Sequence, residues 1–298
     1  MMLAEQKNNR ASCNICGSAS NFIRQELQRE GFLCSNCSAS SRHRAVVYVL
    51  GKCMGTGSIP LVAWPSRKEI RMLESSGRGS YPMILKEKFE YLNTEYHPDA
   101  ALMRQPSSRY ADFQQLAFPD QHFDYVVATD VFEHIREDER AFREVYRVLK
   151  DNSTFILTVP YDREREKTLV RVKTEGDKDI FLLPPEYHGG GGQTLAYRTY
   201  GRDLLDRMRE CGFSVGCLEL EVQRHAIVRQ FVFIGARSSY LDLTRFHSES
   251  INESVYRKMQ ASPLVAFRAF TFVKYNLLSL FHFGSEIGRK VDEKFRKG

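Results

Sequence analysis

The sequence lacks a long apolar run near its N-terminus and has few cysteines, and both absences narrow the classes of protein it can represent. The opening residues MMLAEQKNNRASC turn polar after three positions, so they do not have the basic start and apolar run of a secretion signal. Of 7 cysteines, four form two Cys-x-x-Cys pairs and the others are scattered, which argues against an extracellular disulfide framework. We therefore expect a reduced, cytoplasmic protein.

The net charge is close to zero over most of the chain. The formal net charge is +6, and residues 250–298 hold nine Lys and Arg against four Asp and Glu, so +5 of the total lies in this tail. Residues 1–50 hold six basic against three acidic side chains. This balance is too modest to favour nucleic acid as a partner.

Length and composition predict one full-sized domain with appendages. The 298 residues are 42% apolar, which is enough to bury the core of such a domain. We predict a zinc ribbon at residues 1–41, a main domain at 42–238 and a basic helical tail at 239–298.

Two cysteine pairs predict a metal site in the first fifty residues. Cys13 and Cys16 are separated by two residues, as are Cys34 and Cys37, and seventeen residues lie between the pairs. This spacing is typical of four thiolates around one Zn²⁺ ion. Four thiolates leave no open coordination position, so the zinc would be structural and would supply much of the ribbon's folding free energy. A redox pair is the alternative, but no βαβ pattern surrounds either pair.

A helix is predicted after the second cysteine pair. In SASSRHRAVVYVLGK, Ser41 is placed to cap a helix whose first turn carries Arg42, His43 and Arg44. The simplest interpretation is an amphipathic connector whose basic start faces water. A contact with a phosphate or carboxylate group is the alternative.

Strand and helix patterns alternate through the middle of the chain. Continuous apolar runs at 70–74, 123–129 and 154–159 are typical of parallel strands that are covered on both faces, and a further strand is predicted at 89–95. A helical pattern occupies residues 137–150. We therefore predict a doubly wound, Rossmann-like α/β fold with right-handed crossovers. Ligands in such folds bind beyond the carboxyl ends of the strands.

Acidic residues lie where these strands end. Glu74 is followed by SSGRGSYP. The small residues of this segment would let a cofactor approach the backbone and the free N–H groups at the start of a helix. Glu95 lies 21 residues after Glu74, a distance at which a carboxylate can accept hydrogen bonds from both ribose hydroxyls of an adenosine. Asp112 is placed to accept a hydrogen bond from the adenine amino group while Phe113 packs on the ring, and Asp130 ends the strand at 123–129.

The order of these motifs resembles the class I S-adenosylmethionine (SAM)-dependent methyltransferases, in particular the type 11 branch. The resemblance is carried by LESSGRGS, LNTEY, ADFQQLAFPDQHFDYVVATDVFEHI, FREVYRVLK and FILTVPY. Two further features resemble a bacterial subgroup of these enzymes: the stretch PEYHGGGGQTLAYRTYGRDLLDRMRECGF, and a four-cysteine ribbon followed by RHR. The resemblance covers residues 11–238. The first loop departs from the family's acid-x-Gly-x-Gly-x-Gly pattern, since it reads Glu-Ser-Ser-Gly-Arg-Gly-Ser.

The resemblance implies SAM as cofactor and a role for individual residues. The loop after residue 74 would hold the methionine end of SAM, Glu95 the ribose and Asp112 the adenine, while Asp130 and Glu133 would line the cofactor edge that faces the acceptor. The implied cofactor-binding residues are Glu74, Ser75, Ser76, Gly77, Gly79, Glu95, Tyr96, Asp112, Phe113, Asp130 and Glu133.

The family also implies a terminal antiparallel hairpin. Two β-rich runs at 214–222 and 227–236 follow the helical pattern at 201–213. This ending favours methyl transfer over hydride transfer.

Two histidines lie nearest the predicted site. His134 and His188 are candidate general bases for an oxygen acceptor, whereas a nitrogen acceptor needs none. A surface or structural role is the alternative for each. The glycine run at 189–192 is a candidate lid over the site, with an ordinary flexible loop as the alternative.

We predict a SAM-dependent methyltransferase that acts on a small-molecule acceptor or on a glycan or lipid-linked acceptor, by analogy with related enzymes. One alternative is an RNA methyltransferase that uses the ribbon to grip RNA. Another is a methyltransferase-like binding protein that has lost activity through its altered first loop.

The tail predicts an amphipathic helix at residues 263–283. Charged positions argue against a membrane-spanning segment, and the basic end GRKVDEKFRKG favours a helix at the surface of an anionic membrane, on its inner face. Packing on the main domain or on a second subunit is the alternative. The polar positions recur at steps of three and four, at Arg268, Thr271, Tyr275, Ser279 and His282.

Overall fold

A computed structural model describes residues 11–19, 21–24, 31–96, 109–188, 194–243 and 246, all of which belong to the first of two units, residues 1–257. The predicted lid at 189–192 and the predicted tail helix at 263–283 lie outside the described residues. Among the residues described, no helix has the length and apolar character needed to cross a membrane.

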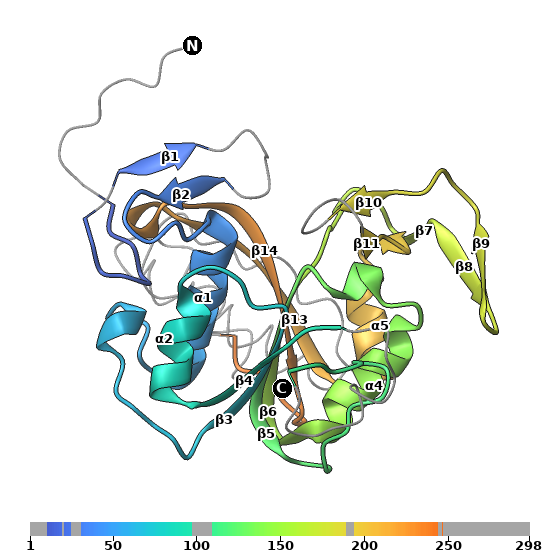
Figure 1. Cartoon of the computed structure of the whole chain (residues 1–298), viewed down its shortest axis with the longest axis horizontal. Coiled ribbons are helices and arrows are strands. Elements are labelled where there is room, and N and C mark those ends of the chain that lie inside the picture. The colour runs from blue at the N-terminus through green and yellow to red at the C-terminus, as the bar shows by residue number, and fades with distance from the viewer. Residues whose placement is uncertain are drawn as a thin grey trace, which may run out of the picture. The chain divides into compact units, whose positions relative to one another are not determined.

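A mixed sheet forms the centre of the described fold, with six strands in the order β13-β14-β6-β5-β3-β4 (Figure 1). Strands β3 to β6 run parallel, and β13 and β14 form an antiparallel hairpin that joins β6. The predicted doubly wound fold and its terminal hairpin are confirmed. The strands are β3 (Arg71–Ser75), β4 (Glu90–Thr94), β5 (Phe123–Thr129), β6 (Leu149–Thr158), β13 (Ser214–Val222) and β14 (Ile227–Ala236).

The strand order reverses between β3 and β5. The chain passes from β3 to β4 on one side and then returns to β5 on the other side of β3. Such a reversal is where open α/β sheets bind their ligands. Glu74 and the buried Ser75 end β3, and Asp130 follows β5, so these candidates flank the reversal.

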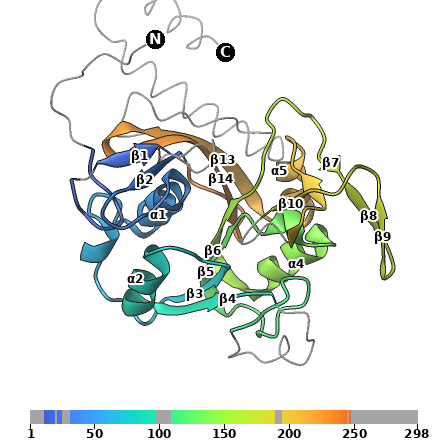
Figure 2. The ribbon, with the colours of Figure 1, turned by 45° about the horizontal axis from the view of Figure 1, so that its top comes forward.

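Helices cover both faces of the sheet, with α1 and α2 on one face and α4 and α5 on the other (Figures 1 and 2). The apolar residues of α4 recur at the spacing of one helix face, which is why that face is buried. The helices are α1 (Ser41–Met54), α2 (Tyr81–Lys88), α4 (Asp138–Val148) and α5 (Leu204–Glu210).

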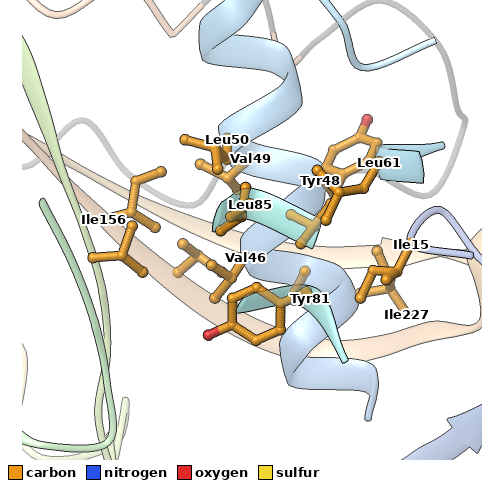
Figure 3. Packing of buried hydrophobic residues seen from close by; sticks show 14 of the residues in the cluster. Ile15, Val46, Tyr48, Val49, Leu50, Leu61, Tyr81, Leu85, Ile156 and Ile227 are labelled. Atoms are coloured by element: carbon orange, nitrogen blue, oxygen red, sulfur yellow. The ribbon is translucent and has the colours of Figure 1, made fainter. Parts of the chain in front are cut away.

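Helix α1 packs in one apolar cluster with both the sheet and the N-terminal segment (Figure 3). Val46 and Leu50 of the helix, Ile156 of β6, Ile227 of β14 and Ile15 of the ribbon are all fully buried in it. The ribbon therefore shares its core with the main sheet. The predicted domain boundaries remain predictions.

Helix α1 begins at an N-cap one residue earlier than predicted. The Ser40 hydroxyl accepts a hydrogen bond from the His43 N–H at 3.3 Å, and the Ser40 N–H donates to His43 Nδ1 at 3.4 Å. Ser41 Oγ instead accepts from the Val228 N–H at 2.9 Å. Ser41 as the cap is therefore wrong, because adjacent serines give the same local signal and only the tertiary contact separates them.

Between β6 and α5 the chain forms three short antiparallel pairs that the sequence did not predict. Their strands are two to four residues long and largely polar, so they carry no apolar alternation. The pairs are β7 (Leu169–Val170) with β12 (Arg198–Thr199), β8 (Val172–Glu175) with β9 (Lys178–Phe181), and β10 (Tyr187–His188) with β11 (Thr194–Leu195).

Candidate functional site

The four paired cysteines converge on one point. A short hairpin, β1 (Phe22–Arg24) with β2 (Phe32–Cys34), connects their two segments. The four Sγ atoms lie within 4.8 Å of one another, with Cys13 and Cys37 at 3.7 Å and Cys16 and Cys34 at 3.8 Å. A tetrahedral zinc ion with sulfurs at about 2.3 Å requires sulfurs about 3.8 Å apart. The donor set therefore fits a structural zinc ion.

Hydrogen bonding between two of these thiols prepares them for a metal. The bond with Cys13 lowers the pKa of Cys37 to about 4, and the same bond raises the pKa of Cys13. The thiolate is the form that binds metal, and the lowered pKa of Cys37 favours that form.

The Arg44 guanidinium ties the ribbon to the end of the sheet. It donates hydrogen bonds to the carbonyl oxygens of Phe32 and Ala39 in the ribbon and of His225 and Ala226 between β13 and β14. Burial lowers the pKa of Arg44, and the nearby cysteine sulfurs raise it. Because Arg44 is 0% exposed, the prediction that the basic start of the helix faces water is wrong for this residue.

Glu74 points into the protein interior. Its carboxylate is 0% exposed and accepts hydrogen bonds from the hydroxyls of Tyr81 and Tyr91, the latter at 2.5 Å. Burial raises the pKa of Glu74 to about 7, although these two hydrogen bonds act in the opposite direction. The packing also requires Gly77, since a Cβ there would lie 2.7 Å from the Glu74 carboxyl carbon. Contact between Glu74 and a cofactor stays a prediction.

The loop after β3 is fixed by the neighbouring strand. The Gly77 N–H donates to Asn93 Oδ1 at 2.9 Å, and Asn93 Nδ2 donates to the Gly77 carbonyl at 2.9 Å. Ser76 has a left-handed φ of 56°, and its N–H donates to the Thr94 carbonyl at 2.7 Å. The end of β4 therefore sets the shape of the loop that the family resemblance assigns to SAM.

The first turn of α1 lies against this loop and the end of β5. A Cβ at Gly79 would lie 3.3 Å from the His43 ring. Arg42 forms an ion pair with Asp130, whose other oxygen accepts a hydrogen bond from Thr158 Oγ1 at 3.0 Å. The predicted carboxylate contact of the basic helix start is therefore present at Arg42.

Glu95 and Asp112 lie on adjoining segments at the carboxyl edge of the sheet. The Glu95 N–H donates to the Arg109 carbonyl at 2.8 Å, and the Ala111 N–H donates to the Glu95 carbonyl at 2.9 Å. The Glu95 side chain is 39% exposed and pairs with Arg109 at 3.2 Å. Asp112 Oδ1 accepts from the Gln114 N–H at 2.8 Å.

The aromatic candidates differ in their surroundings. Phe113 is buried and packs edge-on against Phe132, whereas Tyr96 is exposed. The loop after β3 contacts the end of β4, and Glu95 follows directly with Asp112 alongside, so these segments meet at one edge. This is the arrangement that a shared adenosyl site requires, and the individual contacts with SAM stay predictions.

The two candidate histidines come together although 54 positions separate them in the sequence. His134 ends η2 (Phe132–His134) just after β5, His188 lies in β10, and their ring centroids are 4.7 Å apart. The buried Glu133 places Oε1 3.7 Å from His134 Nε2. Burial lowers the pKa of His134, against a hydrogen bond to the Leu195 carbonyl that raises it. Nothing in the sequence spacing signals this juxtaposition.

A cavity of about 230 Å³ lies elsewhere in the described structure and contains none of the predicted site residues. Its lining includes Cys53, Tyr125, Asn152 and Thr154. Tyr125 and Thr154 pair across β5 and β6 near the start of β5, away from the carboxyl edge.

Comparison with known proteins finds a family match in the middle of the chain. Residues 75–157 match the family model described as "Methyltransferase domain". This segment runs from the last residue of β3 into β6, so it includes Glu95, Asp112, Asp130 and Glu133.

Individual relatives cover less of the chain. The sterol 24-C-methyltransferase erg6 of Aspergillus fumigatus is 33% identical over 118 residues, which is 38% of this chain and 30% of that protein. The sterol 24-C-methyltransferase erg-4 of Neurospora crassa is 40% identical over 58 residues, which is 18% of this chain and 15% of that protein. The chain thus spans less than a third of the length of these curated relatives. A solved SAM-dependent methyltransferase from Mesorhizobium loti is 13% identical and covers 66% of this chain and 97% of its own, with a TM-score of 0.40.

Proposed function

We propose that the chain is a SAM-dependent methyltransferase with a small-molecule acceptor or a glycan or lipid-linked acceptor, because residues 75–157 match the family model of a methyltransferase domain. The observation that carries the proposal is the placement of the matched segment. It supplies the loop after β3, both carboxylates beyond β4 and the turn after β5, all at the reversal of strand order where α/β sheets bind ligands.

The polar groups at this edge fit an adenosyl ligand. Ribose hydroxyls and the adenine amino group are hydrogen-bond donors, and carboxylates are their natural acceptors. Glu95 is partly exposed beyond β4 and Asp112 is half-buried on the adjoining segment, so both can meet a ligand. SAM, when bound, supplies a methyl group on an electrophilic sulfonium, and the chain's task is to orient the acceptor and exclude water.

The segment that follows β6 supports an acceptor with an apolar part. Val170, Phe181, Leu182 and Tyr187 are exposed on the short strands and turns that also carry His188. For an oxygen acceptor, Nε2 of His134 is the ring nitrogen that can accept the hydroxyl proton, because Nδ1 is engaged by the Leu195 carbonyl.

Calorimetric titration with SAM tests the cofactor assignment. We expect wild-type protein to bind SAM and Glu95→Gln to bind about 10- to 100-fold more weakly, since hydrogen bonds to a charged acceptor contribute about 1.5 to 3 kcal/mol. Glu90→Gln is the matched control, because Glu90 lies at the opposite end of the same strand and pairs with Arg71. Absence of SAM binding by the wild type would instead favour a methyltransferase-like binding protein without activity.

Transfer of labelled methyl from SAM into fractionated cell extract tests the acceptor class. We expect label in the small-molecule, glycan or lipid fraction. Label that is confined to RNA would contradict this acceptor class and support the RNA methyltransferase alternative.

A further inference from the structure

Glu133, His134 and His188 form a second cluster of metal-ligating groups, separate from the four cysteines. Each residue offers one ligand atom, and these atoms lie within 4.8 Å of one another. We propose that they bind a divalent first-row metal ion that keeps open positions for the acceptor. Two imidazoles and one carboxylate are a ligand set that suits such ions. The role given to the acceptor rests on the proposed function, whereas the metal binding does not.

His134 presents the correct ring nitrogen to this cluster. Its Nδ1 lies 2.8 Å from the Leu195 carbonyl oxygen. Because a carbonyl oxygen only accepts hydrogen bonds, Nδ1 carries a proton, and Nε2 is the nitrogen whose lone pair is available to a metal when the ring is neutral. Nε2 is also the atom that lies 3.7 Å from Glu133 Oε1. Metal-bound histidines almost always use the other ring N–H in this way, which fixes the tautomer and the ring orientation.

The spacing of the ligand atoms is close to that of a metal centre. Ligands at about 2.1 Å from one ion lie about 3.0 to 3.4 Å apart, so the Glu133 and His134 atoms need to approach by only about 0.5 Å. His188 lies in a two-residue strand and is half-buried, so a small rotation of its side chain can complete the set.

The backbone that carries Glu133 is held in place by the segment around β12. The buried Arg198 guanidinium donates to the carbonyls of Ile135 at 2.7 Å and Arg136 at 2.6 Å. The Tyr197 N–H donates to the Glu133 carbonyl at 2.8 Å. A fixed supporting shell of this kind is what keeps metal ligands in position.

Burial of the Glu133 carboxylate points in the same direction. The side chain is fully buried, and an ionised carboxylate in such surroundings is stabilised by a nearby cation.

The site would face the acceptor. Element η2 follows β5 directly, beside the reversal of strand order, and three protein ligands leave at least one open coordination position. The acceptor class is therefore one that carries an oxygen able to ligate the ion, and a hydroxyl bound there would lose its proton to solvent more readily. The metal would occupy the Nε2 lone pair of His134, so in the metal-bound protein the ion would replace His134 as the group that promotes loss of the hydroxyl proton.

Titration of the full chain, loaded with one equivalent of zinc for the four cysteines, with Mn²⁺ tests the proposal by calorimetry and electron paramagnetic resonance. Carboxylate ligands suit Mn²⁺, whereas thiolates select softer ions such as Zn²⁺, so Mn²⁺ distinguishes this site from the four thiolates. We expect one Mn²⁺ per chain and at least tenfold weaker binding in His188→Gln and Glu133→Gln. His122→Gln is the matched control, because His122 lies just before the amino end of β5 and the proposed metal ligands lie beyond its carboxyl end. This variant should bind Mn²⁺ like the wild type.

Circular dichroism and SAM titration of each variant separate a lost ligand from a lost fold. Glu133 is buried, so His188→Gln keeps the test decisive if Glu133→Gln does not fold. Failure of both Mn²⁺ and Co²⁺ to bind the wild type overturns the proposal, as does undiminished binding by folded His188→Gln. SAM binding without metal binding would support the proposed function and refute the metal site. Metal binding without SAM binding would support the metal site and refute the proposed function.

Discussion

Replacement of Glu74 by glutamine should change how the stability of the fold depends on pH. Glu74 is buried beneath the loop after β3 with the hydroxyls of Tyr81 and Tyr91 as partners. Its pKa is about 7 in the folded protein against an ordinary value of 4.5, so the folded state binds the proton more tightly than the unfolded state does. The stability contributed by that proton is complete below pH 4.5 and is lost as the pH rises through 7.

The size of the effect follows from the two pKa values. Their difference corresponds to about 3 kcal/mol of unfolding free energy over the whole range, of which about 2 kcal/mol is lost between about pH 5.5 and about pH 8. A glutamine side chain does not titrate, so the Glu74→Gln variant escapes this loss. A weaker hydrogen bond from either tyrosine to the glutamine would lower the free energy of unfolding by about 1 kcal/mol at both pH values. This loss therefore cancels when the two pH values are compared. The variant should therefore gain about 2 kcal/mol relative to wild type as the pH rises.

Urea unfolding at the two pH values measures this change. Trp64 is the only tryptophan of the chain and is 2% exposed, so its fluorescence reports loss of the core. Glu90→Gln is the control, because its side chain is 59% exposed and its replacement should leave the pH dependence as in wild type. If Glu74→Gln and wild type differ by the same amount at both pH values, Glu74 does not titrate with a raised pKa and the account of its burial is refuted.

Two further changes test the packing of the fold. Removal of zinc by a chelator should lower the melting temperature of the whole described unit, because Ile15 of the ribbon belongs to the core of the sheet. Calorimetry measures this change, with re-addition of zinc as the control. An unchanged melting temperature would contradict the prediction. Gly77→Ala should cost about 1 to 3 kcal/mol in urea unfolding, since its Cβ would lie 2.7 Å from the Glu74 carboxyl carbon. Gly176→Asn, at a left-handed position with open space, should cost less than about 1 kcal/mol, and equal losses in the two variants would rule out the proposed clash.

The sequence predicts the sheet well because its strands carry strong local signals. The run at 123–129 coincides with β5, and the runs at 214–222 and 227–236 coincide with β13 and β14. These segments are apolar enough that burial on the sheet decides their conformation. The Cys-x-x-Cys spacing likewise predicts the convergence of the four sulfur atoms.

The rest of the site depends on contacts between distant segments. Whether Glu74 turns inward is decided by Tyr81 and Tyr91, and a strand-end acid gives no sign of that direction in the sequence. His188 reaches His134 only because a short polar strand pair is tied through Leu195 to the turn after β5. Periodicity cannot reveal such an arrangement, since strands of two residues have no period.

The position of Arg44 makes the two ends of the described chain depend on each other. One guanidinium connects the backbone of the cysteine-bearing hairpin to the turn between the last two strands. A shortened chain that began at residue 42 would keep this cation and lose the Phe32 and Ala39 carbonyls that accept its hydrogen bonds. The ribbon and the closing hairpin should therefore be exchanged between proteins only as a pair, because replacing either one alone would leave part of the buried Arg44 guanidinium without hydrogen-bond acceptors.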